Sequence, residues 1–250
     1  IAGEKAGIIV PGVPVIYDGN DKDAAEVIAA KAKELGSPAY KVVQAGAKVL
    51  GNNKDGIDFS LEDDYYGDTR FHIPFIAWYQ VMNASLALTT MEVLKDRIPV
   101  TMEQLQAGIA NTRWQGRMET ILPGVIVDGA HNEDGVRRFV ETAERFQKEY
   151  PLTLLFSAVN DKDYQDMIHT ICSRIKFRKV VTTEVGGYRE VPSAELAEIF
   201  CKEGCKDVGN SDNIEEAFHM AHEAKGEDGM LFCVGSLYLV GEIKTLLLKK

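Results

Sequence analysis

Short, continuous apolar runs alternate with stripes of apolar residues at helical spacing along the second half of the chain. Such runs predict buried strands, and such stripes predict helices with one apolar face. Strands alternating with helices of this length predict a parallel, helix-covered sheet, and therefore an α/β fold. The strands are predicted at 124–128, 152–159, 180–183 and 230–234, and the helices at 136–146, 164–175, from 193 onward, at 214–224 and after 234.

The first 112 residues show a less regular pattern of the same kind. Thr101 followed by Gln104 is typical of a capping box at the start of a helix. The other predicted elements are a strand at 13–17, a helix at 24–35, a β-ribbon at 40–61 with its turn at 51–56, and a buried helix at 83–94.

A polar stretch at 111–117 separates these two patterns. It contains a glycine and has no hydrophobic periodicity, which is typical of a linker. We therefore predict two domains, residues 1–112 and residues 113–250.

Acidic residues outnumber basic ones by 38 to 28, which gives a formal net charge of −10. That charge opposes extended contact with a phosphate backbone, so nucleic acid is not an expected partner. No apolar run approaches the ~20 residues that a membrane-spanning helix needs. Ile1 stands where an initiator Met is expected, and we interpret it as a cut or processed end.

The cysteines show no spacing typical of a metal or redox motif. Cys201 and Cys205 are one helical turn apart, and the other two are Cys172 and Cys233. Because a free cysteine behaves as a small apolar residue, we expect all four to be reduced and to serve in packing. This usage favours a cytoplasmic protein.

Residues 128–132, Asp-Gly-Ala-His-Asn, lie where a predicted strand ends and a helix begins. Ligands of open α/β sheets bind outside the carboxyl ends of strands, and helix N-termini attract anions. Asp128 and His131 are therefore candidate binding or catalytic residues. The alternative is a helix cap beside a surface histidine, because Asn and Asp are favoured caps.

Three further positions each allow a functional and a structural interpretation. Arg117, in the predicted linker, suits a phosphate or nucleotide through its planar fork of donors, or is a solvated charge. Ser236 follows a strand and is either a ligand contact or a helix cap, and Asn83 at a predicted helix start could equally be a cap. The charged turn at 161–163 follows another strand.

Several motifs occur together and in a defined order. They are Glu4-Lys5-Ala6-Gly7-Ile8, Gln80-x-x-Asn83-Ala84, Gly116-Arg117-Met118-Glu119, Asp128-Gly129-Ala130-His131-Asn132, Asp161-Lys162-Asp163 and Gly235-Ser236-Leu237-Tyr238. In this order the chain resembles the folylpolyglutamate synthase/dihydrofolate synthase family of the Mur ligase superfamily. The resemblance implies the remainder of a P-loop-type Mur ligase central domain, followed by a complete Rossmann-like Mur ligase C-terminal domain.

The resemblance also implies an activity. The family uses ATP and Mg²⁺ to phosphorylate a carboxylate of folate or dihydropteroate, and the amine of L-glutamate then displaces phosphate. It implies nucleotide contacts at Asn83, Arg117 and Asp128, glutamate contacts at His131 and Ser236, and a catalytic role for Lys5 and His131, with Lys5 holding a second Mg²⁺ if carbamylated. Where the family often has Gly-x-His-Gln, the chain has Ala77 in place of the Gly and Tyr79 in place of the His, so only Asn83 is carried over from that motif.

No Gly-x-x-x-x-Gly-Lys-Ser/Thr run, which would cradle ATP phosphates, occurs in the sequence. We therefore expect this chain to be a fragment that is inactive alone. We expect the full-length enzyme to be a monomer. One alternative is a fragment of a peptidoglycan Mur ligase. Another is a non-catalytic, Rossmann-like protein that binds a small ligand, since fold alone does not define function.

Overall fold

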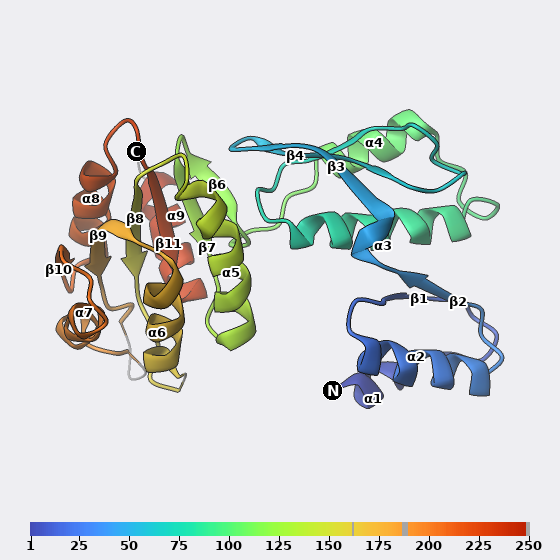
Figure 1. Ribbon diagram of the computed structural model, residues 1–250, viewed down its shortest axis with the longest axis horizontal. Helices are drawn as coiled ribbons and strands as arrows, with labels where there is room; N and C mark the ends of the chain where they lie inside the picture. The colour runs from blue at the N-terminus through green and yellow to red at the C-terminus, as the bar shows by residue number, and fades with distance from the viewer. Residues whose placement is uncertain (162, 187–189, 249–250) are drawn as a thin grey trace. The chain divides into compact units, whose positions relative to one another are not determined.

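The computed structural model describes residues 1–161, 163–186 and 190–248 (Figure 1). The chain divides into two compact units, Ile1–Arg113 and Trp114–Lys250. The domain boundary predicted from the polar stretch, at about residue 112, lies next to this division. Lys162, in the predicted charged turn, lies outside the described residues.

The second unit is built on a six-stranded sheet with the order β10-β9-β8-β11-β7-β6. The pairs among β10, β9, β8, β11 and β7 are parallel, and only β6 pairs antiparallel, with β7. All residues of β7, β8 and β11 are buried, as expected for strands covered on both faces. The strands are β6 Glu119–Leu122, β7 Val125–Asp128, β8 Leu152–Phe156, β9 Phe177–Thr182, β10 Val208–Asn210 and β11 Met230–Val234.

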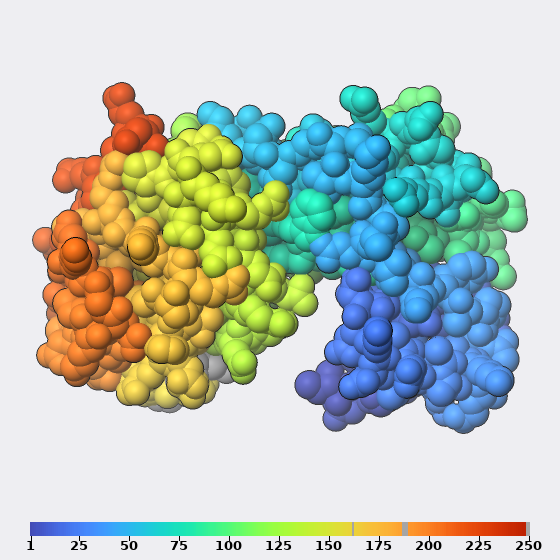
Figure 2. Space-filling model, in the orientation of Figure 1, coloured from blue at the N-terminus to red at the C-terminus, as the bar shows by residue number. Residues whose placement is uncertain are grey.

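Helices cover both faces of this sheet. On one face, α8 and α9 pack on Val125, Leu155 and Cys233 in a continuous apolar core. On the other face, Phe139 of α5 stacks edge-on against Phe232 of β11, and α5 and α6 hide the strands from the side seen in Figure 2. The helices are α5 Glu133–Phe146, α6 Tyr164–Arg174, α7 Ser193–Lys202, α8 Ile214–Lys225 and α9 Leu237–Leu248. The α/β architecture predicted from the sequence is confirmed.

The first unit contains two small sheets. Strands β1 and β2 form a parallel pair, and β3, β4 and β5 form an antiparallel sheet. The second sheet and helices α3 and α4 share a core that includes Phe59, Phe71 and Leu88. The elements are α1 Ala2–Ala6, β1 Val15–Asp18, α2 Lys22–Glu34, β2 Ala39–Val42, η1 Gln44–Gly46, β3 Ala47–Asn53, β4 Gly56–Leu61, β5 Phe71–Ile73, α3 Tyr79–Val93 and α4 Met102–Ala110.

Three local predictions are wrong. The predicted ribbon at 40–61 is two structures, because residues 39–42 pair in parallel with β1 and only β3 and β4 form the hairpin. Helix α3 begins at Tyr79, so Asn83 lies inside it and not at its start. Cys201 is exposed and is not a packing residue.

The capping box predicted at Thr101 is present. The Thr101 hydroxyl accepts a hydrogen bond from Gln104 N at 3.3 Å, and the Gln104 side chain accepts one from Thr101 N at 2.9 Å. Both bonds satisfy amide groups that the first turn of a helix leaves without partners. Among the described residues, no helix combines the length and apolarity that crossing a bilayer requires.

Candidate functional site

Asp128, the last residue of β7, joins two loops at the carboxyl edge of the large sheet. Its Oδ2 accepts a hydrogen bond from Met118 N at 2.8 Å, and its Oδ1 accepts one from Ala130 N at 2.7 Å. The residue is 4% exposed. Asp128 therefore fixes the loop before β6 against the turn that follows β7.

The burial of Asp128 has an electrostatic consequence. Desolvation raises the pKa of its carboxyl group from 3.8 to about 6. The two backbone hydrogen bonds and the nearby side chains of Arg117 and His131 lower the pKa, but they offset the desolvation only in part. The carboxylate thus stays ionised at neutral pH in a place where its charge is poorly solvated, and it favours positive charge nearby.

Two further contacts hold the same loops together. Gly129 N donates to Gly116 O at 2.7 Å, and the Glu119 carboxylate accepts from Gly116 N at 2.8 Å and from Lys244 Nζ of α9 at 2.8 Å. The turn after β7 lies so close to α9 that a Cβ added at Gly129 would lie 2.2 Å from Leu237 Cδ2. A side chain there would force Leu237 to move.

His131 follows this turn with a defined orientation. Its Nδ1 lies 2.7 Å from Gly129 O, and because a carbonyl can only accept, Nδ1 must carry the proton. In the neutral ring Nε2 is then left as an acceptor. Asn132 caps α5, since its Oδ1 accepts from Gly135 N at 2.8 Å.

His131 lines a cavity of about 490 Å³ between the starts of α5 and α6. Polar side chains dominate its walls. The other lining residues are Asn132, Glu133, Asp161, Asp163, Asp166, Met167, His169 and Thr170. The sequence motifs point to His131 and the 161–163 turn. They do not indicate Asp166 or His169, which join the cavity only because α6 packs beside α5.

Arg117 and Ser236 lie at the same edge of the sheet. Arg117 is partly exposed, and within the part of the chain that the structure describes its guanidinium makes no side-chain hydrogen bond. Ser236 follows β11, the neighbour of β7, and is 2% exposed. Its hydroxyl accepts from Tyr238 N at 3.1 Å, so the helix-capping interpretation describes its contact here.

Lys5 and Asn83 belong to the first unit, and their functional roles stay predictions. Lys5 is exposed in α1. Asn83 is exposed on α3 and donates from Nδ2 to Gln80 Oε1 at 2.7 Å. In the described ranges no three His, Cys, Asp or Glu side chains are grouped so that they could hold a metal ion.

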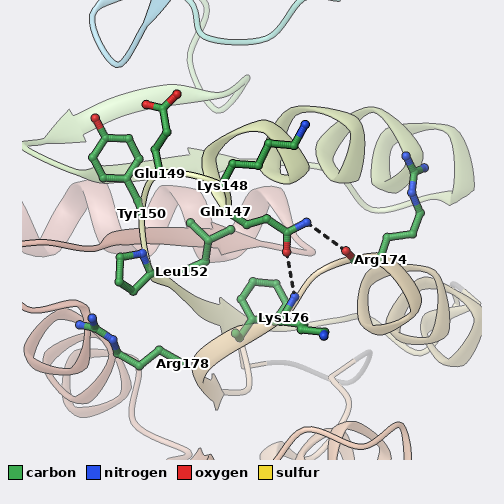
Figure 3. Close-up of a pocket in the computed structure, with 10 residues that line it drawn as sticks. Gln147, Lys148, Glu149, Tyr150, Leu152, Arg174, Lys176 and Arg178 are labelled. Atoms are coloured by element: carbon green, nitrogen blue, oxygen red, sulfur yellow. Dashed lines mark hydrogen bonds between the residues drawn. The ribbon is translucent and has the colours of Figure 1, made fainter.

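A larger hollow, about 760 Å³, lies at the opposite, amino-terminal edge of the sheet (Figure 3). Gln147 bridges its two sides, donating to Arg174 O and accepting from Lys176 N, both at 3.2 Å. Its basic side chains point in different directions, and Arg174 and Arg178 are ion-paired with Glu144 and Asp228. The hollow offers no convergent set of groups among the residues described.

Another hollow of about 1090 Å³ lies in the first unit, between the β3–β4 hairpin and the loop at 62–70. Acidic residues outnumber basic ones in its wall. None of the candidate residues lines it. The convergence of Arg117, Asp128 and His131 at one edge therefore distinguishes the carboxyl end of the large sheet from both hollows.

Residues 116–237 match the family model described as Mur ligase, glutamate ligase domain. The second unit is a Mur ligase glutamate ligase domain. This confirms the family resemblance deduced from the motifs, and the match begins and ends at two of them, Gly116 and Leu237.

Relatives of this chain extend the similarity to both units. The chain is 30% identical over 257 residues to a dihydrofolate synthase/folylpolyglutamate synthase of Bacillus subtilis, with 98% of this chain and 57% of the relative covered. It is also 30% identical to the folylpolyglutamate synthase of Lacticaseibacillus casei, covering 99% and 57%. A crystal structure of the Thermotoga maritima folylpolyglutamate synthase has a TM-score of 0.79 and 25% identity, covering 99% and 57%. The chain thus spans a little over half the length of these relatives.

Proposed function

We propose that this chain is part of an ATP-dependent ligase that joins L-glutamate to a folate or to dihydropteroate through an acyl phosphate. The observation that carries the proposal is the grouping of Arg117, Asp128 and His131 at the carboxyl edge of a Mur ligase glutamate ligase domain. Solved folylpolyglutamate synthases of this fold include complexes with ADP and AMPPCP, which supports ATP as the phosphoryl donor.

Arg117 is suited to the anionic part of the reaction. Its guanidinium lies near the Asp128 carboxylate, which keeps the loop in place, yet it forms no side-chain hydrogen bond among the described residues. A guanidinium with free donors can bind a phosphate or a carboxylate in a bidentate manner. We assign Arg117 to the nucleotide phosphates or to the acyl phosphate.

His131 is suited to the amine of glutamate. Its Nδ1 proton is engaged by Gly129 O, so Nε2 can accept a proton from the ammonium group of glutamate, which leaves the free amine as the nucleophile. The acidic wall formed by Glu133, Asp163 and Asp166 favours the same positively charged end of the amino acid. Bound Mg²⁺ would neutralise the transferring phosphoryl group, but the described residues form no cluster that holds it.

The test is ligation by the protein expressed from its complete gene. With ATP, Mg²⁺, tetrahydrofolate and L-glutamate, it should release phosphate and yield a folate that is one glutamate heavier by mass spectrometry. The 250-residue chain alone should give neither. Turnover by the chain alone at a rate normal for an enzyme would refute its dependence on a separate phosphate loop.

Assays with alternative substrates distinguish this function from the two other candidate functions. Extension of a UDP-linked muramyl peptide with no reaction on folates would assign the protein to peptidoglycan synthesis. Tight binding of glutamate or nucleotide by the complete protein without any product would instead support a non-catalytic binding protein. Dihydropteroate and tetrahydrofolate, offered separately, distinguish the two folate activities.

A further inference from the structure

Two cysteines that are far apart in sequence lie side by side in the second unit. Cys172 is in the last turn of α6, and Cys205 follows α7. Their sulfur atoms are 3.6 Å apart across a sequence separation of 33 residues. Both side chains are partly exposed, and both are free thiols.

The two thiols are not chemically equivalent. The pKa of Cys205 is lowered, because the Cys172 thiol can donate a hydrogen bond to its thiolate. The pKa of Cys172 is raised by the same hydrogen bond and by burial. Since the thiolate is the reactive form, Cys205 is the better first nucleophile, and Cys172, whose sulfur lies beside it, is left as the resolving thiol.

A neighbouring contact also joins α6 to the segment that follows α7. His169, one turn before Cys172 on α6, lies with its Nδ1 2.9 Å from the Glu203 carboxylate, two residues before Cys205. A disulfide needs its sulfur atoms about 2.05 Å apart. The two sulfur atoms are therefore roughly 1.5 Å farther apart than in a disulfide.

We propose that Cys172 and Cys205 are a redox modification site that forms a reversible intramolecular disulfide with a small-molecule disulfide such as oxidised glutathione as the oxidant. The Cys205 thiolate attacks one sulfur of glutathione disulfide, and one glutathione thiolate leaves. Cys172, losing its proton to solvent, then attacks Cys205 Sγ and displaces the second glutathione. Two protein thiols are oxidised, and one glutathione disulfide is reduced to two thiols.

The disulfide would join the end of α6 to the segment that leads into β10. Its effect extends to the candidate site, because α6 contributes Asp166 and His169 to the 490 Å³ cavity. The other two cysteines do not compete for the same partner. Cys233 is fully buried within β11, and Cys201 is exposed without a sulfur neighbour in the described chain.

The test is equilibration of the chain in glutathione buffers of stepped redox ratio, followed by acid quenching, alkylation and peptide mapping. We expect a Cys172–Cys205 crosslinked peptide, loss of two alkylatable thiols, and full reversal by dithiothreitol. The crosslink should raise the melting temperature of the second unit by about 5–10 °C, because it restricts the unfolded chain.

Variants identify which thiol does what. Cys172→Ser should stop the reaction with glutathione attached at Cys205, whereas Cys201→Ser should leave the crosslink unchanged. Circular dichroism confirms that each variant is folded. Modification of Cys201 alone, a Cys201–Cys205 crosslink, or Cys172 and Cys205 both still open to alkylation under fully oxidising conditions would overturn the proposal.

Discussion

Replacing Asp128 by Asn tests whether burial of the ionised carboxylate lowers the stability of the folded protein. The substitution keeps the shape of the side chain. It exchanges one acceptor oxygen for an NH₂ group, so either Met118 N or Ala130 N loses its partner. Leaving one buried donor unsatisfied costs about 1–3 kcal/mol at any pH.

In the wild-type protein, the contribution of the Asp128 carboxyl group to the free energy of unfolding depends on pH. The ordinary pKa of an aspartate carboxyl is 3.8, and in the folded protein the pKa of Asp128 is about 6. Below pH ~4 the carboxyl is protonated in both the folded and the unfolded state, and the stabilising effect of the neutral form is fully present. As pH rises through 6 that effect is lost, which amounts to about 3 kcal/mol.

Asp128→Asn removes this pH dependence. The wild-type protein should therefore be more stable than the variant at pH 4, by about 1–3 kcal/mol. At pH 7 the variant should be equally stable or more stable. Urea unfolding followed by circular dichroism at pH 4, 5, 6 and 7 gives the difference in the free energy of unfolding between the two proteins. Because both proteins contain the same other titrating groups, the contributions of those groups cancel in this difference.

The matched control is Asp134→Asn. Asp134 is exposed on α5, and its ion pairs with Arg137 and Arg138 lower its pKa, so this substitution should weakly destabilise the protein as pH rises above 4. Curves for wild type and Asp128→Asn that run parallel from pH 4 to 7 would refute the raised pKa.

Three further variants test other parts of the account. His131→Ala should lower kcat of the complete enzyme by about 100-fold, with an unchanged melting temperature. The control, His219→Ala on α8, should leave kcat unaltered. Equal losses of kcat in the two variants would contradict the role assigned to His131. Thr101→Ala should destabilise the first unit by about 1 kcal/mol in urea unfolding, and no change would show that the capping box is dispensable. Gly235→Ala should destabilise the second unit by about 2–4 kcal/mol, because φ is +112° and a Cβ would lie 2.0 Å from Ser157 O; wild-type stability would contradict that geometry.

The elements of the second unit are predictable because local pattern and burial agree. Strand β11 is apolar at every position and is bounded by Gly229 and Gly235, and it lies where its pattern places it. Helix α5 follows equally well from its apolar stripe. The short edge strand β10 is not predictable in this way, because the three residues Val208–Asn210 carry no alternation and depend on pairing with β9.

The start of α3 shows a different limit. Trp78 precedes the helix without a side-chain capping bond, so the sequence has no start signal there. The polar Asn83 is the first residue in this segment that resembles a cap, and it places the predicted start too late. Its exposed position inside the helix costs little, and the buried Val81 and Leu88 on the opposite side determine where the helix lies.

The candidate site is predictable in its residues but not in its contacts. Asp128 and His131 stand out because they follow a strand, a position that depends on local sequence. The bond from Met118 to Asp128 and the approach of Lys244 to Glu119 depend on the packing of β6 and α9 against β7, across separations of 10 and 125 residues. Cys172 and Cys205 are brought together in the same way, by the packing of α6 against α7.

The central claim is that the activated carboxylate meets glutamate at the carboxyl edge of the β7–β11–β8 sheet. A crystal structure of the complete protein with a phosphorus-containing analogue of the tetrahedral intermediate tests it directly. We expect ligand density within hydrogen-bond distance of Arg117 and His131. Density in the hollow between Gln147 and Arg178, or at any surface that excludes both residues, would contradict it.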